Sequence, residues 1–349
     1  HLGNYSVKPH ALTLPHNPND MRCPILFSLL FLLVLQSVDA QQSTAWQWME
    51  PADTLNKQRF WISLGSGATI YSGAAVGLYH TWYKGFELTK FHTFDDSREW
   101  QQMDKAGHLL TTYTETRLLY DGARWTGLGK NKSLWLAGAA GMFLQSTVEV
   151  MDGFSAKWGF SWSDMGFNAL GMGAFVLQES VWDEQRISFK ISTNNRLPSE
   201  DEYVWSTDGQ RSASLRERHI ELFGRSLPER FIKDYNTMTV WASVNVASFA
   251  PQSRWPKWLN IAGGYGAANL YGGFGNSWSD DEGYNYRLTD PPYERYREFY
   301  LSLDVDLKRI PTRRRFLRSV LSVLNFIKIP APTLEWNTAG KLRFHALYF

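Results

Sequence analysis

The chain of 349 residues has a single cysteine, Cys23, which lies near the N-terminus. Met21 and Arg22 precede a short apolar run, and Ala40 provides a small-residue site before Gln41. This order predicts a signal peptide over residues 21–40, and we interpret residues 1–20 as a non-native upstream extension. A retained membrane anchor is the alternative, although the apolar run is short for a span. Cleavage would leave no thiol, which excludes disulfides, Cys-bound zinc and Cys nucleophiles.

An excess of charge of one sign is also absent. The 36 basic and 34 acidic residues give a net charge of +2, so we expect no nucleic-acid partner. Glycines between residues 263 and 275 alternate with aromatic residues, which favours a flexible loop or bent strands. Their spacing does not match a phosphate-binding loop, so we expect no nucleotide either.

Aromatic residues are abundant, with 16 Trp, 16 Tyr and 21 Phe. Such rings are favoured at a membrane-water interface, and a large aromatic core is the alternative explanation. Residues 60–80 contain no charged side chain over the length of a bilayer crossing, although a buried core helix would fit as well. We therefore expect a membrane or envelope lipid as partner, with an envelope protein as the alternative.

The most informative stretch runs from residue 104 to residue 178, where polar residues recur one helical turn apart among Gly, Ala and apolar residues. They are Asp104, His108, Glu149, Asp152, Asp164 and Asn168. Residues four apart share a helical face, as Asp104 and His108 do. Glu149 ends its helix against the helix dipole, so helix stability does not explain it. Because ionisable groups in such helices are costly unless they face each other or a wet cavity, we predict that they converge.

These residues also form a recognisable pattern. Asp-Lys-x-x-His is followed by a small-residue helix ending in Glu, and then by Trp-Ser-Asp-x-x-x-Asn-x-x-Gly. The pattern resembles the YfiM-like family of predicted periplasmic proteins, a domain of unknown function, and is more distantly similar to the VanZ-like family. The resemblance covers residues 100–185 and implies no particular reaction. The matching positions are Asp104, Lys105, His108, Glu149, Asp152, Asp164, Asn168 and Gly171. The chain lacks the cysteine that lipoprotein-like relatives have at the cleavage point.

Beyond residue 185 the periodicity changes. Residues 187–192, 238–246 and 299–307 alternate as half-buried strands do. Residues 214–234 and 312–326 predict amphipathic helices, and the second is basic enough to lie on an anionic membrane, with a solvated surface helix as the alternative. Residues 341–349 resemble the last strand of outer-membrane barrels, but five to seven strand candidates favour a small half-open sheet.

The predicted fold class is therefore α+β. An N-terminal bundle of about four Gly/Ala-rich helices, residues 41–185, precedes a part with antiparallel strands and amphipathic helices, residues 186–349. Residues 194–209 are rich in Ser, Asp and Glu and are the expected linker.

Three functions remain open, all in the cell envelope, in the periplasm or at the outer membrane. The first is a structural or assembly protein in which the polar residues form a buried network. The second is an enzyme that acts on an envelope lipid or a phosphorylated head group; transport or small-ligand binding is a third.

The candidate catalytic residues are His108, Asp104, Glu149 and Asp164, and the candidate binding residues are Lys105, Asp152, Asn168 and Trp162. One His with carboxylates suits a hard or borderline metal but lacks the several His typical of zinc, so we assign no metal, and the cofactor is unknown.

Overall fold

The computed structural model describes residues 48, 50–80, 87–194, 196–288 and 292–349. The predicted signal peptide and upstream extension lie outside the described residues. Trp48–Phe349 form one unit, separate from His1–Gln47. The predicted boundary at residues 185–186 falls in the short turn that joins the last long helix to the first strand.

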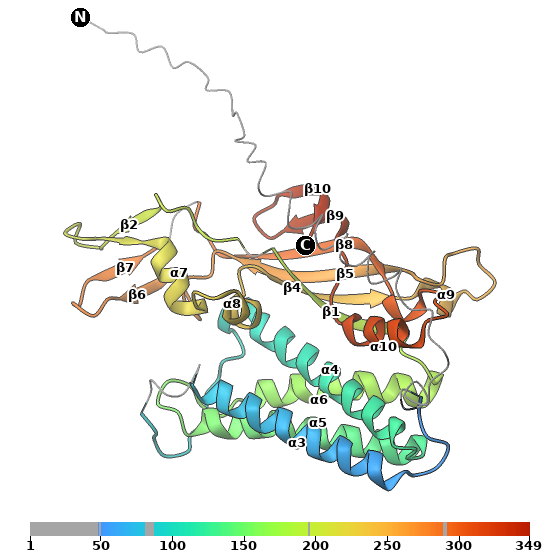
Figure 1. The fold of residues 1–349 in the computed structure, drawn as a ribbon. Helices are drawn as coiled ribbons and strands as arrows, with labels where there is room; N and C mark the ends of the chain where they lie inside the picture. The colour runs from blue at the N-terminus through green and yellow to red at the C-terminus, as the bar shows by residue number, and fades with distance from the viewer. Residues whose placement is uncertain (1–47, 49, 81–86, 195, 289–291) are drawn as a thin grey trace, which may run out of the picture. The chain divides into compact units, whose positions relative to one another are not determined.

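The described part of the chain begins with four long helices: α3 (Lys57–Leu78), α4 (Met103–Trp125), α5 (Lys130–Gly153) and α6 (Trp162–Trp182). α4, α5 and α6 pack against one another, and α3 contacts α4 (Figure 1). Asn56 caps α3 and Ser161 caps α6 by accepting a backbone N–H, as Asn and Ser do at helix starts. Arg59 is the only buried residue of α3, so the three later helices form the packed part of this region.

α4 and α6 approach each other closely at Gly171. A Cβ atom at this position would lie 2.2 Å from the carbonyl oxygen of Leu109. Only glycine fits there, and the small residue lets the two helix backbones come almost into contact. This contact fixes Asp104 and His108 on α4 opposite Asp164 and Asn168 on α6.

One sheet of six strands forms the C-terminal part, with all pairs antiparallel in the order β1-β4-β5-β8-β9-β10. The strands are β1 (Ile187–Thr193), β4 (Met238–Val244), β5 (Leu259–Ala268), β8 (Tyr296–Val305), β9 (Ala331–Asn337) and β10 (Leu342–Tyr348). Two small ribbons pair β2 (Tyr203–Trp205) with β3 (Ser212–Ser214) and β6 (Ser277–Ser279) with β7 (Asn285–Arg287). The mixed architecture of helices followed by antiparallel strands is thus as predicted, and within the described residues β1 and β10 are the edges of an open sheet.

Shorter helices interrupt the strands. The single helix predicted over residues 214–234 is wrong: the chain forms α7 (Leu215–Phe223) and α8 (Leu227–Lys233). Gly224 has a φ of 90°, which stops the first helix, and Ser226 and Glu229 form a capping box that starts the second. α10 (Arg315–Leu324) confirms the second predicted helix, and α9 (Val246–Phe249) and the 3-10 turn η3 (Leu307–Arg309) complete this part.

The polarity of the sheet is the reverse of what a soluble sheet shows. The buried side chains of β8 and β9 are polar, while the apolar residues between them are exposed. The buried polar set includes Asn260, Ser302, Asp304, Thr333, Glu335 and Asn337. We name the exposed apolar set the outer face; it comprises Ile261, Phe299, Leu301, Leu303, Leu334, Trp336, Leu342 and Phe344, each 37–70% exposed. The predicted alternation is therefore present, with the polar side turned inward.

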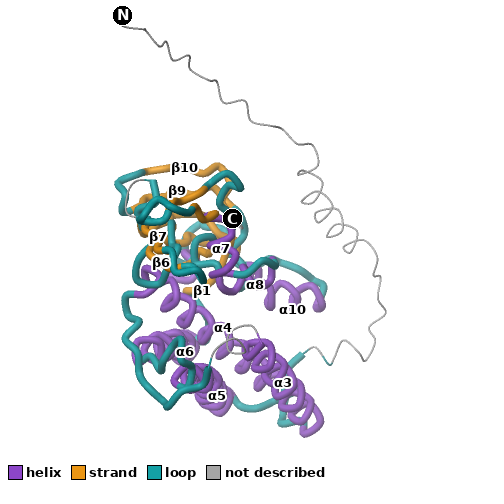
Figure 2. The backbone as a smooth tube through the Cα atoms, turned by 90° about the vertical axis from the view of Figure 1, so that its left-hand side faces the viewer, coloured by secondary structure: helices purple, strands orange, loops and turns teal. Residues whose placement is uncertain are grey.

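α4 joins the helices to the sheet. It contacts β1, β4 and β5 as well as α5 and α6, and Figures 1 and 2 show it next to the strands. One hydrophobic cluster contains Met103 and Leu110 of α4 together with Ile191 and Val240 of the strands. Apolar burial against two layers holds α4 firmly, and α4 carries three of the candidate site residues.

Candidate functional site

The predicted polar residues of three helices converge around His108. We name this group the His108 cluster; it consists of Asp96, Asp104, Lys105, His108, Glu149, Asp164 and Asn168. α4 supplies Asp104, Lys105 and His108, the end of α5 supplies Glu149, and the start of α6 supplies Asp164 and Asn168. Asp96 comes from the segment before α4. The convergence expected from the one-turn spacings is observed.

Lys105 lies at the centre of the carboxylates. Its Nζ is 2.8 Å from Asp96 Oδ2, 2.8 Å from Asp164 Oδ1 and 3.0 Å from Asp104 Oδ2, and its side chain is 1% exposed. Burial by itself would lower the pKa of Lys105, but the charges of Asp104 and Asp164 outweigh burial and raise it. Lys105 is therefore a buried structural cation whose three donors are occupied by carboxylates.

His108 faces the remaining carboxylate oxygens. Its Nε2 lies 3.6 Å from Glu149 Oε1, 3.8 Å from Asp164 Oδ2 and 3.9 Å from Asp104 Oδ1. On the other side of the ring, Nδ1 lies 3.1 Å from Asn168 Oδ1. Because a carbonyl oxygen only accepts, Nδ1 donates this hydrogen bond and Nε2 is directed at the three carboxylates.

The protonation of the cluster is strongly perturbed. Burial raises the pKa of Glu149 to about 8, and burial together with the charge of Asp104 raises the pKa of Asp164 to about 7. Burial opposes ionisation of Asp96 as well, but hydrogen bonds with Asp164, Lys105 and Ser161 lower its pKa to about 2. Burial opposes a charge on His108, yet the three facing carboxylates raise its pKa. Burial and close charges thus favour the protonated forms of Glu149, Asp164 and His108.

A strained turn leads into α4. Trp100, Gln101 and Gln102, within the 3-10 turn η2 (Glu99–Gln102) and at the N-cap of α4, have φ values of 48°, 52° and 62°, a region that non-glycine residues rarely adopt. The C-terminal part holds this turn. Tyr265 donates to the carbonyl oxygen of Gln101, and Arg297 donates to Gln102 Oε1 at 2.6 Å. The strands therefore help to set where Asp104 and Lys105 point.

The two remaining predicted site residues lie outside the His108 cluster. Asp152 is half-buried near Glu149, and its charge contributes to the raised pKa of Glu149. Trp162 is 73% exposed and packs edge-on against Phe160, so it does not cover the cluster. Access is limited all the same, because the side chains of Glu149, Lys105 and Asp164 are 1–5% exposed and those of His108 and Asp104 are 16% and 21% exposed.

Sequence reasoning missed three participants. Asp96 pairs with Lys105 and accepts from Ser161 at 2.6 Å, and Tyr235 donates to Asp104 Oδ1 at 2.7 Å. Asp96 and Ser161 precede helices and have no helical periodicity to mark them. Tyr235 is 131 residues from Asp104 in sequence, so no local pattern could have indicated it.

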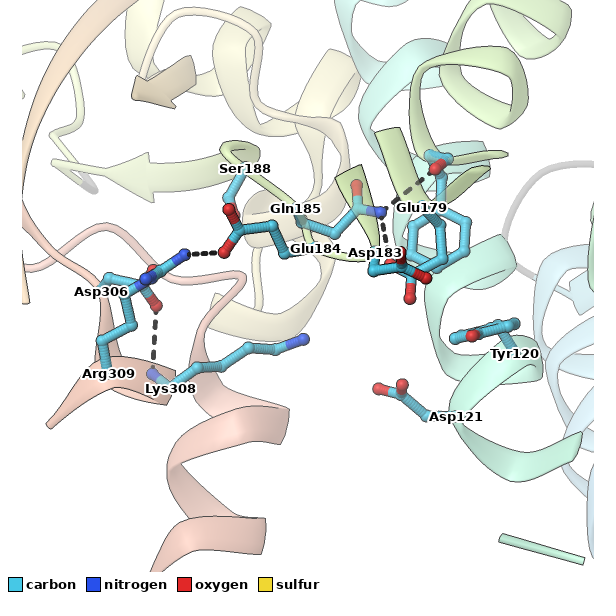
Figure 3. A pocket seen from close by; sticks show the side chains of 11 residues that line it. Tyr120, Asp121, Glu179, Asp183, Glu184, Gln185, Ser188, Asp306, Lys308 and Arg309 are labelled. Carbon is cyan, nitrogen blue, oxygen red and sulfur yellow. Dashed lines mark hydrogen bonds and ion pairs between the residues drawn. The ribbon is translucent and has the colours of Figure 1, made fainter. Parts of the chain in front are cut away.

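Two cavities lie elsewhere in the described part of the chain. A cavity of about 270 Å³ lies beside Tyr120, Glu179 and Lys308, and Figure 3 shows Glu184 paired with Arg309 at its wall. A second cavity of about 410 Å³ is lined by Glu99, Trp100, Trp158 and Arg218, among others. No residue of the His108 cluster lines either of these two cavities.

Among the described residues, Asp104, His108 and Asp164 place one potential ligand atom each within 4.8 Å of one another, a group that could hold a metal ion. One described helix, α5, has the length and composition to cross a membrane, and a third of its most apolar window is buried. Residues 60–80, which were expected to reach bilayer length, belong mostly to α3, and α3 does not meet this criterion.

Comparison with known proteins found a similarity for part of the chain. A family model described as "Predicted periplasmic lipoprotein (DUF2279)" matches residues 93–180. The matched segment spans the entire His108 cluster, from Asp96 to Asn168, and it starts after Cys23. No curated protein and no solved structure matches the chain. The similarity to this family supports an exported, envelope-associated protein of unknown function.

Proposed function

We propose that this chain is a membrane-associated protein of the cell envelope with a structural or assembly role. The outer face of the sheet is the observation that carries the proposal. Its eight apolar side chains are neighbours across strands, since Leu301 pairs with Leu334, Leu334 with Phe344, and Phe299 with Trp336. The rings of Phe299 and Trp336 stack 5.3 Å apart.

A sheet with a polar interior and an apolar exterior is unfavourable in water, because its apolar surface stays in contact with water and the free energy of burying that surface is not gained. The same sheet is favourable against lipid acyl chains, as in membrane strands that alternate apolar-out and polar-in. Lipid is therefore the partner that fits the outer face.

The helices present further apolar surface. On α5, Trp135 and Phe143 are 82% and 63% exposed, and on α6, Leu170 and Leu177 are 58% and 64% exposed. α3 is exposed along most of its length, including Ile70 at 72%. We propose that α3 completes a four-helix bundle whose outer side contacts lipid, and that residues 100–185 are related to the YfiM-like and VanZ-like families.

In this proposal the His108 cluster fixes the mutual register of α4, α5 and α6. It contains buried ion pairs and hydrogen bonds from every helix, and interior polar networks specify packing in this way. Low exposure of Glu149, Asp164 and Lys105 supports this role.

The test is fractionation of cells that express the tagged chain, followed by carbonate extraction of the membranes. We expect the chain to be exported, to sediment with membranes and to resist extraction. Recovery of the chain in the soluble periplasmic fraction would refute the lipid contact. Quantitative release by carbonate would show a peripheral protein bound through charge.

A second candidate is a hydrolase or transferase acting on a phosphorylated envelope lipid. The convergence of one imidazole with three carboxylates within 3.9 Å favours it. Purified protein should then turn over a phosphorylated lipid, and His108→Ala should abolish turnover without changing the thermal midpoint. A midpoint that collapses in His108→Ala would assign His108 a structural role.

A further inference from the structure

The arrangement around His108 Nε2 is not that of a hydrogen-bonded imidazole. The three carboxylate oxygens lie 3.6, 3.8 and 3.9 Å from Nε2, beyond the 2.7–3.2 Å range of N–H···O hydrogen bonds. Ligand atoms about 2.0–2.2 Å from a tetrahedral ion are roughly 3.3–3.6 Å from one another. Each oxygen is therefore within a few tenths of an ångström of a ligand-to-ligand distance from Nε2, and Asp104, His108 and Asp164 place ligand atoms within 4.8 Å of one another.

Glu149 Oε1 provides a separate indication. The residue is 1% exposed, and Oε1 has no hydrogen-bond partner among the described residues. Its other oxygen, Oε2, accepts from the backbone N–H of Ser161 at 3.2 Å, so the side chain is held in place. A buried carboxylate oxygen without a donor is costly, and this one points at His108 Nε2.

Carboxyl groups outnumber the lysine in the cluster. Four carboxylates, those of Asp96, Asp104, Glu149 and Asp164, surround a single permanent cation, Lys105. Lys105 contacts Asp104 Oδ2 and Asp164 Oδ1, which leaves Asp104 Oδ1 and Asp164 Oδ2 facing His108. These two oxygens and Glu149 Oε1 thus converge on Nε2, where a bound cation would stabilise all three groups as carboxylates.

We propose that Asp104, His108, Glu149 and Asp164 bind a divalent first-row transition-metal ion. One imidazole nitrogen with carboxylate oxygens is a ligand set for borderline and hard ions such as Zn²⁺, Fe²⁺ and Mn²⁺. Asn168 has the role of an outer partner, because its Oδ1 accepts from Nδ1 and orients the opposite nitrogen toward the ion. Lys105 pairs with the other oxygens of Asp104 and Asp164 and leaves the position of the ion free.

This inference stands apart from lipid association, since the ion would bind inside the helices whether or not the sheet contacts a membrane. It is tested with the full exported chain, purified without a polyhistidine tag and stripped of metal. Equilibrium dialysis against Zn²⁺, Mn²⁺, Mg²⁺ or Ca²⁺ is read by elemental analysis, and thermal unfolding is recorded with and without each ion. We expect one Zn²⁺ or Mn²⁺ per chain, weaker Mg²⁺ and Ca²⁺ binding, and a higher midpoint with metal.

Two near-isosteric variants, Asp164→Asn and Glu149→Gln, remove one ligand charge each. Both should weaken binding by about tenfold or more, since even outer partners of a metal cost that much when lost. Glu115→Gln is the matched control, because Glu115 lies on α4 but bonds to Gln145 and not to His108. Its affinity should equal that of the wild type.

Metal-free protein gives a second measurement. Metal should raise the midpoint of the wild type above that of its metal-free form, and in Glu149→Gln this increase should disappear. No stoichiometric binding of any of the four ions by the wild type would overturn the proposal. Equal affinity of the wild type and Asp164→Asn would also overturn it, and would place the bound ion elsewhere in the chain.

Discussion

Serine substitutions across the outer face test the lipid contact quantitatively. Leu301, Leu334 and Phe344 lie side by side on β8, β9 and β10, since Leu301 pairs with Leu334 and Leu334 pairs with Phe344. They are 56%, 41% and 70% exposed. The triple variant Leu301→Ser, Leu334→Ser, Phe344→Ser removes a continuous apolar strip and leaves the buried polar side of the strands intact.

The expected magnitude follows from the exposed fractions. Full burial of a Leu or Phe side chain is worth about 2 kcal/mol, and roughly half of each of these side chains remains to be buried by lipid. The three residues together therefore contribute about 3 kcal/mol to membrane binding. At about 1.4 kcal/mol per factor of ten, the partition coefficient should fall on the order of 100-fold.

The assay is flotation of purified chain with phospholipid vesicles over a range of lipid concentrations. The matched control is Leu55→Ser, Leu88→Ser, Leu227→Ser, which removes three leucines that are 51%, 77% and 60% exposed and lie outside the sheet. The control should partition like the wild type. Far-ultraviolet circular dichroism in detergent checks that both variants are folded.

Two results would refute the reasoning. If the outer-face variant and the control lose partitioning equally, general apolar exposure and not the outer face determines binding. If neither loses partitioning, the outer face does not contact lipid, and its apolar side chains require a protein partner instead.

Three further predictions concern stability. Lys105→Met should destabilise the chain by about 3–5 kcal/mol in guanidinium unfolding, because it leaves three buried carboxylates without their cation; a loss below 1 kcal/mol would contradict the buried pairing. Gly171→Ala should cost about 1–3 kcal/mol or more, because its Cβ would overlap Leu109, whereas Gly173→Ala meets nothing within 4 Å and should gain up to about 1 kcal/mol. Burial raises the pKa of Glu298 from 4.5 to about 7, so its favourable contribution is complete below pH 4.5 and is lost as the pH rises through 7. Glu298→Gln should therefore flatten the stability profile between these pH values by at most about 3 kcal/mol, and unchanged profiles would argue against burial of this carboxyl.

Local patterns were sufficient for much of the fold. The one-turn polar spacings indicated the helices that became α4, α5 and α6, and period-two alternation indicated β1, β4, β8 and β10. The break between α7 and α8 was missed because amphipathic periodicity continues across Gly224, and only its positive φ ends the helix. Strand order could not be derived, because it depends on pairings between residues far apart in sequence.

The candidate site was predictable in its helical members and no further. The sequence indicated Asp104, His108, Glu149 and Asp164, because side chains spaced three or four residues apart lie on the same face of a helix. Asp96 and Tyr235 entered through tertiary contacts, and Trp162 did not join the cluster although it is adjacent in sequence to the Ser163-Asp164 start of α6. Which side of each strand is buried was also beyond sequence reasoning, since alternation is the same in either orientation.

A buried ion pair inside the sheet is an example of a structural carboxylate whose oxygens are all hydrogen-bonded. Lys190 Nζ lies 2.7 Å from Asp304 Oδ2, and both side chains are fully buried. Lys190 also donates to the carbonyl oxygen of Val305 and to Asn325, while Asp304 accepts from Ser243 and from the backbone of Ile329. Every oxygen of that carboxylate has a donor, and one cation meets one anion. The ionisable side chains of the His108 cluster are 1–21% exposed, and the cluster has four carboxyl groups for one lysine and one histidine, with an oxygen of Glu149 that has no donor. The same chain therefore builds one fully hydrogen-bonded carboxylate and one group with an unpaired carboxylate oxygen, and a bound divalent cation would remove that difference.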